Sequence, residues 1–335
     1  MLKEIKEEPD KLKRILLRAD DVREIAREIK NIKRVFVIGR GTSDNAGLYG
    51  KYIFEIICRI PSECYPPSIF TYYNVNLLNK NSLVLLLSQS GETPDVIRGI
   101  EAAKNANAPS LLITNERDST GAEMADYVIF TDAGREEAIA ATKTYVSELL
   151  ELYLLCSFLS NLCDIPFYLP EKVKEIIKIE KKIREIAYSM SGIEKMICIG
   201  RGVNYPTALE ASLKLKETSY IFSEAISGCD LWHGPLAIIE DGFPIMALTP
   251  DDRLKKPLLE LIQKLKDVRA YILSVSDSHE VNSIADKHIE VPYIKNEFLT
   301  PITHIVPVQI FSNYLAYAKG INPDEPRYLT KVTKR

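Results

Sequence analysis

Hydroxyl side chains gather in one loop of the sequence, at residues 88–93. The hydroxyl- and amide-bearing side chains of this loop are Ser88, Gln89, Ser90 and Thr93. The loop follows an apolar run, and Pro94 comes next, which suits the first turn of a helix because its missing N–H is not needed there. The hydroxyls and free backbone N–H groups would then converge at the positive end of a helix dipole, which favours a phosphate monoester. The alternative is a serine-rich turn that only caps the helix.

A second turn with glycines precedes another expected helix. Gly39 and Gly41 follow the apolar residues 34–38, and Thr42 and Ser43 then offer hydroxyls at the start of the helix. The third glycine of a dinucleotide fingerprint is absent, and no Gly-Lys-Ser or Gly-Lys-Thr follows, so a nucleotide P-loop is excluded. The alternative is an ordinary strand-to-helix turn that Ser and Thr cap.

Side chains that could move protons lie in the second half of the chain. Helical spacing places Glu210, Lys214 and Glu217 on one stripe of a helix. A carboxylate on such a stripe can serve as a general base, but most stripes of this kind are solvated faces with ion pairs. The spacing alone leaves both interpretations open.

His233 stands beside the single Trp of the chain, in a stretch with Gly and Pro, where a catalytic role and a structural role are both open. No metal-ligand spacing joins it to the other three histidines, which are His279, His288 and His304. We therefore expect no zinc site. Lys331 lies near the C-terminus, where disorder is common.

The chain repeats itself. Residues 37–41 recur as residues 198–202, 161 residues later, with Ile-Gly-Arg-Gly in common. A repeat of this length predicts two copies of one architecture. The copies differ in chemistry, because the first keeps the hydroxyls that could hold an anion and the second keeps the Glu and the His that could move protons.

Short apolar strands alternate with helices in both halves. In the first half we expect strands at 34–38, 83–88, 110–114 and 127–131 and helices at 1–30, 44–57, 94–106 and 137–162. In the second half we expect strands at 195–199, 244–248, 270–275 and 288–291 and helices at 171–190, 206–220, 255–266 and 301–319. This alternation predicts an α/β fold with two doubly wound parallel-sheet domains. Ligands of such sheets bind beyond the carboxyl ends of the strands, where the loops described above fall.

The expected organisation is an N-terminal helical segment at 1–30, a first domain at 31–165, a second domain at 166–320 and a tail at 321–335. The net charge of −3 gives no reason to expect binding to nucleic acid or to an acidic membrane. Residues 149–162 form the longest apolar candidate, but they contain Glu151 and fit a buried helix better than a membrane span of about 18 residues. Six cysteines without a CxxC pair, and a charged N-terminus without a signal peptide, predict a cytoplasmic protein without disulfides.

These motifs together resemble the tandem sugar isomerase (SIS) domain family, in particular the isomerase half of glutamine:fructose-6-phosphate amidotransferases and the stand-alone glucosamine-6-phosphate deaminases. The motifs that carry the resemblance fall in order along nearly the whole chain, at residues 39–43, 88–93, 140–143, 208–217, 233–237 and 326–331. The resemblance implies two flavodoxin-like domains that arose by duplication.

The resemblance also implies roles for single residues. The residues expected to hold the sugar phosphate and nearby hydroxyls are Thr42, Ser43, Ser88, Gln89, Ser90 and Thr93. Glu217 would shuttle a proton between C1 and C2, and Lys214 would assist near the open-chain oxygens. His233 would open the sugar ring from the neighbouring subunit of a homodimer, and Lys331 would meet the open-chain ketose. The resemblance implies no metal and no organic cofactor.

Some positions depart from the amidotransferase pattern. About 30 residues precede the first strand and residue 2 is Leu, so we expect no glutamine hydrolysis in this chain. Ala141 stands where the amidotransferase has a Ser that contacts sugar, and the ending from Lys331 to Thr333 resembles the deaminases. The expected reaction therefore interconverts glucosamine 6-phosphate with fructose 6-phosphate and ammonia. A plain phosphosugar isomerase, a sugar-amine phosphate deglycase, a synthase subunit served by a separate glutaminase, and a non-catalytic sugar-phosphate sensor stay open.

Overall fold

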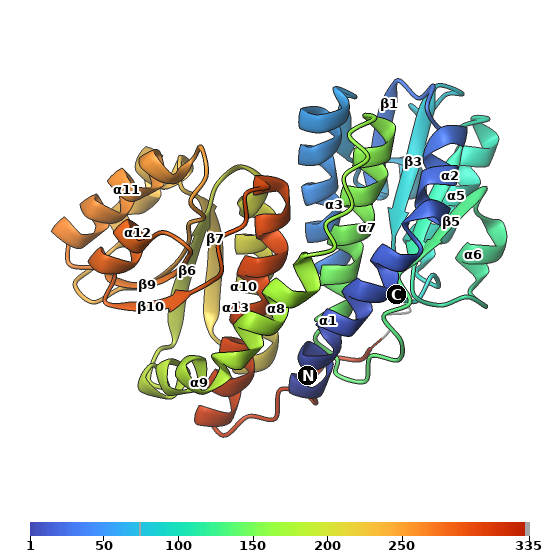
Figure 1. Ribbon diagram of the computed structural model, residues 1–335. Helices are drawn as coiled ribbons and strands as arrows, with labels where there is room; N and C mark the ends of the chain where they lie inside the picture. Colours follow the sequence, from blue (N-terminus) through green and yellow to red (C-terminus); the bar gives the residue numbers. More distant parts are fainter. Residues whose placement is uncertain (74, 332–335) are drawn as a thin grey trace. The chain divides into compact units, whose positions relative to one another are not determined.

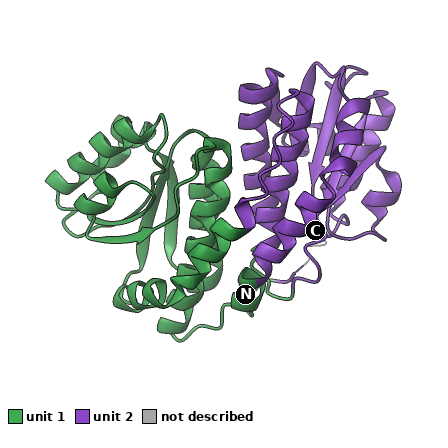
Figure 2. Cartoon of the chain, viewed as in Figure 1, with its two compact units in different colours: residues 1–6, 137–142, 171–329 green, residues 7–136, 143–170, 330–335 purple. Residues whose placement is uncertain are grey.

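The chain forms two compact units, which Figure 2 colours separately. The computed structural model describes residues 1–73 and 75–331, so residues 332–335 of the expected tail lie outside the described part. Unit 1 contains Met1–Lys6, Glu137–Thr142 and Glu171–Leu329. Unit 2 contains Glu7–Glu136 and Lys143–Pro170, and Thr330 and Lys331 also belong to it.

Unit 2 is built on a five-stranded parallel sheet with the order β2-β1-β3-β4-β5. Its strands are β1 (Arg34–Ile38), β2 (Ser62–Cys64), β3 (Ser82–Leu87), β4 (Ser110–Thr114) and β5 (Tyr127–Phe130). The strands β3 and β4 are buried throughout, as expected when helices cover both faces of a parallel sheet.

Helices flank this sheet on both faces (Figure 1). They are α2 (Ala19–Glu28), α3 (Thr42–Ile53), the π-helix η1 (Phe54–Cys58), α4 (Ser68–Thr71), α5 (Pro94–Asn105), α6 (Thr120–Met124) and α7 (Lys143–Leu159). Helix α1 (Leu2–Leu17) begins in unit 1 and continues in unit 2, and the helix expected at 1–30 is therefore two helices that meet at Arg18.

Unit 1 repeats the design with a second five-stranded parallel sheet, in the order β10-β9-β8-β6-β7. Its strands are β6 (Lys195–Gly200), β7 (Phe222–Ser227), β8 (Pro244–Leu248), β9 (Tyr271–Ser276) and β10 (Lys287–Glu290). Its longer helices are α8 (Leu169–Lys178), α9 (Glu180–Ser189), α10 (Tyr205–Ser219), α11 (Lys255–Asp267), α12 (His279–Ile284) and α13 (Thr300–Ala318). The first strand of each copy lies between the second and the third, so the expected duplication and fold class are confirmed.

Two strands were not predicted from the sequence. Both β2 and β7 are edge strands that pair with one neighbour, and they carry polar residues such as Glu63 and Glu224. An edge strand needs less apolar surface than a central strand, so its sequence carries a weaker signal.

The helix expected at 137–162 begins six residues later than predicted, at Lys143. The Glu4 carboxylate accepts hydrogen bonds from the backbone N–H groups of Glu137 and Ala138. The Glu136 carboxylate accepts the N–H of Thr144 at 3.3 Å, inside the first turn of α7. Carboxylate side chains thus satisfy backbone N–H groups both before α7 and in its first turn, where no intrahelical acceptor exists.

Helix α7 is buried along nearly its whole length, as the apolar run at 149–162 predicted, and it packs against α2 and α3. Burial raises the pKa of Glu151 on this helix to about 8, although the nearby Arg18 guanidinium, 3.2 Å away, opposes the change. None of the helices in the described residues is long and apolar enough to cross a membrane.

The buried Glu151 makes stability depend on pH. Its folded pKa lies above the ordinary value of 4.5, so protonation favours the folded state. The contribution is complete below pH 4.5 and is lost as the pH rises through 8, because the folded protein must then hold a buried carboxylate. Urea unfolding between pH 5 and 8.5 should show stability falling with pH, and Glu151→Gln should flatten that slope. Equal slopes for both proteins would contradict this assignment.

Candidate functional site

The hydroxyl loops of unit 2 lie at the point where the sheet changes direction. Strand β1 has β2 on one side and β3 on the other, and the register pairs Val37 with Leu85 and Ile38 with Leu86. The loops after β1 and β3 therefore leave the same edge of the sheet side by side. In this strand order the crevice between these two loops is the usual ligand site.

The loop after β3 folds back on itself through its hydroxyls. The Ser88 and Thr93 hydroxyl oxygens lie 2.9 Å apart, and the N–H of Gly91 donates to Ser88 Oγ at 3.2 Å. The N–H of Glu92 donates to Ser90 Oγ at 3.3 Å. The backbone oxygen of Gln89 accepts the N–H of Asn115 at 3.1 Å, which joins the loop to the end of β4. We call residues 88–93 the cradle loop.

The cradle loop ends at the N-terminus of a helix, as predicted. Thr93 precedes α5 in an extended conformation, and Pro94 is its first residue. The Thr93 side chain makes no capping bond to the described part of α5 and contacts Ser88 instead. This arrangement weakens the interpretation of a turn that only caps the helix.

Gly91 is required by the geometry of the cradle loop. Its φ of +64° is in the left-handed region, and a Cβ there would lie 2.2 Å from Ser119 Oγ. Ser119 cannot easily move, because its hydroxyl accepts the N–H of Ala122 and donates to Glu116.

We therefore expect Gly91→Ala to destabilise the protein by about 1–3 kcal/mol, since strain and crowding act together. Gly192→Ala is the matched control, because a Cβ there meets no atom within 4 Å and its φ is not positive. Chemical unfolding of both variants gives the comparison, and equal stability would show that the loop tolerates a side chain.

The turn after β1 supplies the next two predicted residues. Gly41, with a φ of +56°, precedes α3, and Thr42 is the first residue of that helix. The Ser43 hydroxyl donates to buried Glu148 Oε1 at 2.8 Å. A direct contact of this hydroxyl with a ligand would cost that bond, so Ser43 is the least supported of the predicted phosphate contacts.

Arg40 is a basic group near the cradle loop that the sequence interpretation missed. Its guanidinium Nε lies 2.6 Å from Asp95 Oδ2 in the first turn of α5. The signal was its place between the two glycines of the turn, although 55 residues separate it from Asp95. A positive charge therefore lies beside the neutral donors.

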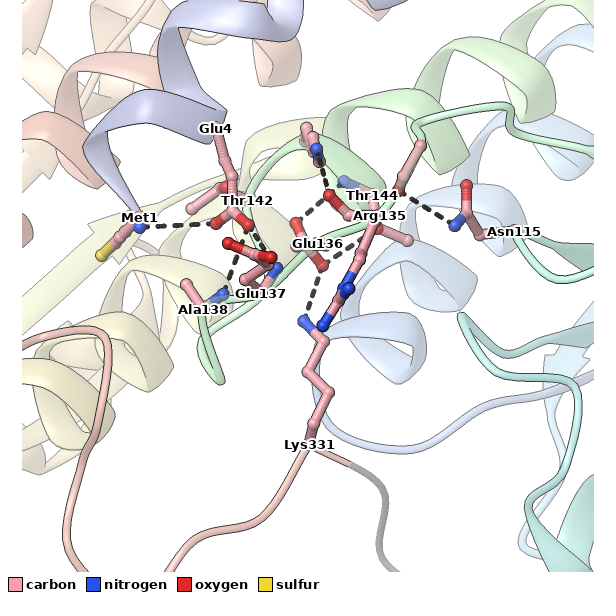
Figure 3. Close-up of polar contacts among 12 residues, drawn as sticks. Met1, Glu4, Asn115, Arg135, Glu136, Glu137, Ala138, Thr142, Thr144 and Lys331 are labelled. Atoms are coloured by element: carbon pink, nitrogen blue, oxygen red, sulfur yellow. Dashed lines mark hydrogen bonds and ion pairs between the residues drawn. The ribbon is translucent and has the colours of Figure 1, made fainter.

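Lys331 reaches a buried carboxylate of unit 2 (Figure 3). Its Nζ lies 3.0 Å from Glu136 Oε2, and the Glu136 side chain has no exposed surface. Thr144 donates its N–H to Glu136 Oε1 at 3.3 Å and its hydroxyl to Oε2 at 3.0 Å. The tail residue is therefore placed by a specific ion pair, and sequence reasoning had missed Glu136.

In unit 1, helix α10 holds the predicted carboxylates and Lys214 together. Lys214 Nζ lies 3.2 Å from Glu210 Oε1 and 2.6 Å from Glu217 Oε2. The side chains of Glu210 and Lys214 have no exposed surface, and that of Glu217 is 21% exposed. The interpretation as a solvated helix face is therefore wrong, because α10 lies against its sheet and α13 together.

Burial alone would lower the pKa of Lys214, but the charges and hydrogen bonds of Glu210 and Glu217 outweigh it and raise the pKa well above its usual range. Lys214 is therefore a permanent ammonium group. It orients one oxygen of the Glu217 carboxylate through the 2.6 Å contact.

Glu217 lines a cavity of about 480 Å³ in unit 1. The other lining residues are Lys216, Tyr220, Ile221, Phe222, Arg327, Tyr328 and Leu329. The Arg327 guanidinium carbon lies 4.3 Å from the centre of the Tyr220 ring, and the backbone N–H of Arg327 donates to the Tyr220 hydroxyl at 2.8 Å. Part of the C-terminal motif at 326–331 thus forms a wall beside Glu217.

His233 lies in unit 1 at the end of a short 3₁₀ helix, η3 (Asp230–His233), that follows β7. Its side chain is exposed, and Gly234 beside it has a φ of +132°. Its role stays a prediction. The described residues contain no group of three or more His, Cys, Asp or Glu side chains arranged to hold a metal ion.

The two sheets match one known family. The family model of the SIS domain matches residues 28–157 and 189–319. The chain belongs to the SIS domain family. Both matches coincide with the two copies of the repeat, so each unit carries the core of one SIS domain.

Known SIS proteins match almost the whole chain. The glutamine–fructose-6-phosphate aminotransferase (isomerizing) of Pyrococcus horikoshii is 37% identical over 340 residues, which cover 99% of this chain and 57% of that protein. The chain thus spans little more than half the length of this relative. The structure of the C-terminal domain of glucosamine-fructose-6-phosphate aminotransferase from Francisella tularensis matches with a TM-score of 0.87 at 29% identity, covering 97% of this chain and 98% of the domain.

A third comparison shows likeness of fold alone. Glucosamine-6-phosphate deaminase from Thermotoga maritima matches with a TM-score of 0.79 at 24% identity and covers 100% of this chain and 99% of its own.

The two SIS domains of this chain differ at equivalent strand ends. Where the first has the cradle loop after β3, the second has Thr249, Asp251 and Asp252 after β8. Burial raises the pKa of Asp252 to about 6, the N–H of Leu254 opposes this, and the charges of Glu297 and Asp277 add to it. The cradle loop has three hydroxyl side chains where the second loop has only Thr249, so the first SIS domain offers more neutral donors to an anion.

Proposed function

We propose that this SIS protein converts phosphosugars, and specifically that it interconverts glucosamine 6-phosphate with fructose 6-phosphate and ammonia. The main observation in support is the cradle loop, which places neutral hydroxyl donors at the N-terminus of α5 in the switch point of the first sheet. The names of the relatives, which are aminotransferases acting on fructose 6-phosphate, support the same substrate class.

In this proposal the cradle loop holds the phosphate. Ser88, Ser90 and Thr93 would bind its oxygens with their hydroxyls, and Thr42 and Gln89 would bind phosphate or nearby sugar hydroxyls. Binding of the phosphate holds the reacting carbons in a defined position. Less entropy is then lost when the sugar reaches the transition state of the later steps.

A carboxylate supplies the proton chemistry. Glu217 would remove the proton from one of the two carbons C1 and C2 and return it to the other. The Glu217 side chain is partly buried, and Lys214 Nζ, 2.6 Å away, orients one of its carboxylate oxygens. Lys214 would also stabilise negative charge that develops on the open-chain oxygens.

Two further residues complete the proposed reaction. His233 would act as the acid and base that opens the sugar ring, because imidazole titrates near neutral pH. Lys331 would meet the carbonyl of the open-chain ketose, with which an amine can form an imine. No metal or organic cofactor takes part in these steps.

The proposed homodimer places His233 in the site of the neighbouring subunit. Mixing Glu217→Gln protein with His233→Ala protein, under conditions that exchange subunits, should then recover part of the activity that each variant lacks. No recovery after exchange has been verified would show that each subunit uses its own histidine.

The proposal is tested directly with purified protein. Glucosamine 6-phosphate should release ammonia and fructose 6-phosphate, and fructose 6-phosphate with ammonium should form glucosamine 6-phosphate. Isomerisation of fructose 6-phosphate without ammonia exchange would identify a plain isomerase, and ammonia released only from other sugar-amine phosphates would identify a deglycase. Tight phosphosugar binding without turnover would identify a sensor.

One observation favours a second candidate, a synthase subunit. The relative from Pyrococcus horikoshii is named a glutamine–fructose-6-phosphate aminotransferase, so glutamine, served by a separate glutaminase chain, is the alternative nitrogen source to free ammonium. Glucosamine 6-phosphate formation that depends on glutamine and an added glutaminase, and that free ammonium does not support, would favour this candidate over the deaminase.

A further inference from the structure

The contact between Lys331 and Glu136 joins residues that lie 195 positions apart in the chain. The Lys331 side chain is 26% exposed, whereas the Glu136 side chain has no exposed surface. The tail around Lys331, from residue 321 to 331, contains neither helix nor strand. A specific ion pair therefore holds an otherwise irregular segment.

The Glu136 carboxylate is held in place by hydrogen bonds that do not involve Lys331. It accepts two hydrogen bonds from Thr144 in the first turn of α7, where the helix dipole favours negative charge. A buried carboxylate still gains from a cation, since desolvation of an unpaired charge is costly. The pair therefore offsets the entropy cost of ordering the tail at this one point.

The segment that contains Glu136 is connected to the cradle loop through hydrogen bonds of Asn115. Asn115 donates its side-chain Nδ2 to the backbone oxygen of Gly134 at 3.1 Å, two residues before Glu136. The N–H of Asn115 donates to the backbone oxygen of Gln89 at 3.1 Å. A short chain of hydrogen bonds thus connects the anchor of Lys331 with the loop that would hold the phosphate, all within unit 2.

We infer that Glu136 is a positioning residue, which holds the Lys331 ammonium at a defined place relative to the cradle loop. This inference rests on the proposed function, because it assumes that Lys331 meets the carbonyl of a phosphosugar that the cradle loop binds. A lysine displaced by even 1 Å reacts far more slowly, so the anchor has a large effect on rate and a small effect on phosphate binding.

The reaction of Lys331 leaves a product that can be measured. The ammonium loses one proton to solvent, the free amine forms a bond to the carbonyl carbon, and the carbonyl oxygen leaves as water, which gives an imine. Borohydride then adds hydride to the imine carbon and fixes the sugar on the lysine as a secondary amine. Mass spectrometry of the peptide that contains Lys331 measures the fraction trapped.

The test compares Glu136→Gln with wild type, using fructose 6-phosphate and borohydride. We expect the rate of trapping at Lys331 and kcat for ammonia release to fall about tenfold or more, while KM changes little. Thr144→Val is the matched control. It removes the hydroxyl bond to the same carboxylate but keeps the backbone N–H bond and the ion pair, so trapping and kcat should stay within about threefold of wild type.

A purely structural role for Glu136 would give equal losses in both variants, and wild-type behaviour of Glu136→Gln would overturn the inference outright.

Limited trypsin digestion separates failure of the Glu136 anchor from failure of the proposed function. Cleavage after Lys331 requires the lysine to leave Glu136, so Glu136→Gln should accelerate it about tenfold relative to cleavage after Arg327, whereas Thr144→Val should not. An inactive wild type with this digestion pattern would refute the proposed function but retain the anchor, and unchanged digestion would refute the anchor.

Discussion

Replacing Glu217 by Gln is expected to lower kcat for ammonia release by about 10²–10⁴-fold, the usual contribution of a positioned general base. Gln keeps the size of the side chain and can still contact Lys214, but it cannot take a proton from the sugar. The Kd for fructose 6-phosphate should change little, because the proposed phosphate contacts all lie in unit 2. Steady-state kinetics together with calorimetric titration measure the two quantities.

Glu224→Gln is the control for this experiment. Glu224 is an exposed residue of the neighbouring strand β7, so the change removes one negative charge from the same unit without touching the cavity beside Glu217. Its kinetics should match wild type. If Glu217→Gln retained full turnover, the proton transfer would have to be assigned to another group and the proposed mechanism would fail.

The positions of the cradle loop and the turn after β1 could be predicted because each follows a central strand. Strands such as β3, which is buried throughout, leave a continuous apolar run that marks where the next loop begins. Their adjacency could not be derived from spacing. It depends on β1 lying between β2 and β3, and β2 is a short edge strand whose residues Ser62, Glu63 and Cys64 carry no strand pattern.

The ion pairs of the site show a second limit of prediction from the sequence. Glu210, Lys214 and Glu217 could be placed on one helical stripe, but the spacing could not show that this stripe is buried. Its burial depends on α13, which lies about a hundred residues later and packs against α10. The same holds for Lys331, whose partner Glu136 sits in a segment that was expected to precede a helix and has no motif of its own. Charged residues with distant partners look like surface residues until the fold is known.

Replacing Lys214 by Met is expected to have the largest effect on stability. Met retains most of the volume but removes the ammonium group that lies 3.2 Å from Glu210 Oε1 and 2.6 Å from Glu217 Oε2, so the fully buried Glu210 carboxylate loses this ion pair. Breaking a buried pair from one side typically costs about 3–5 kcal/mol, because the remaining charge stays desolvated. Urea unfolding measures this loss.

Two companion variants decide whether the lost charge is the cause. Lys216→Met removes an exposed lysine from the same helix, two residues away, and should change stability by about 0.5 kcal/mol or less. The double change Lys214→Met with Glu210→Gln removes both buried charges, so it should recover a substantial part of the loss although each site is altered. A double variant as unstable as the sum of its parts would indicate that packing, and not the unpaired carboxylate, accounts for the destabilisation.

If the lost charge is the cause, Lys214→Met must also be less destabilised at pH 5 than at pH 8, because protonation neutralises a carboxylate that has lost its partner.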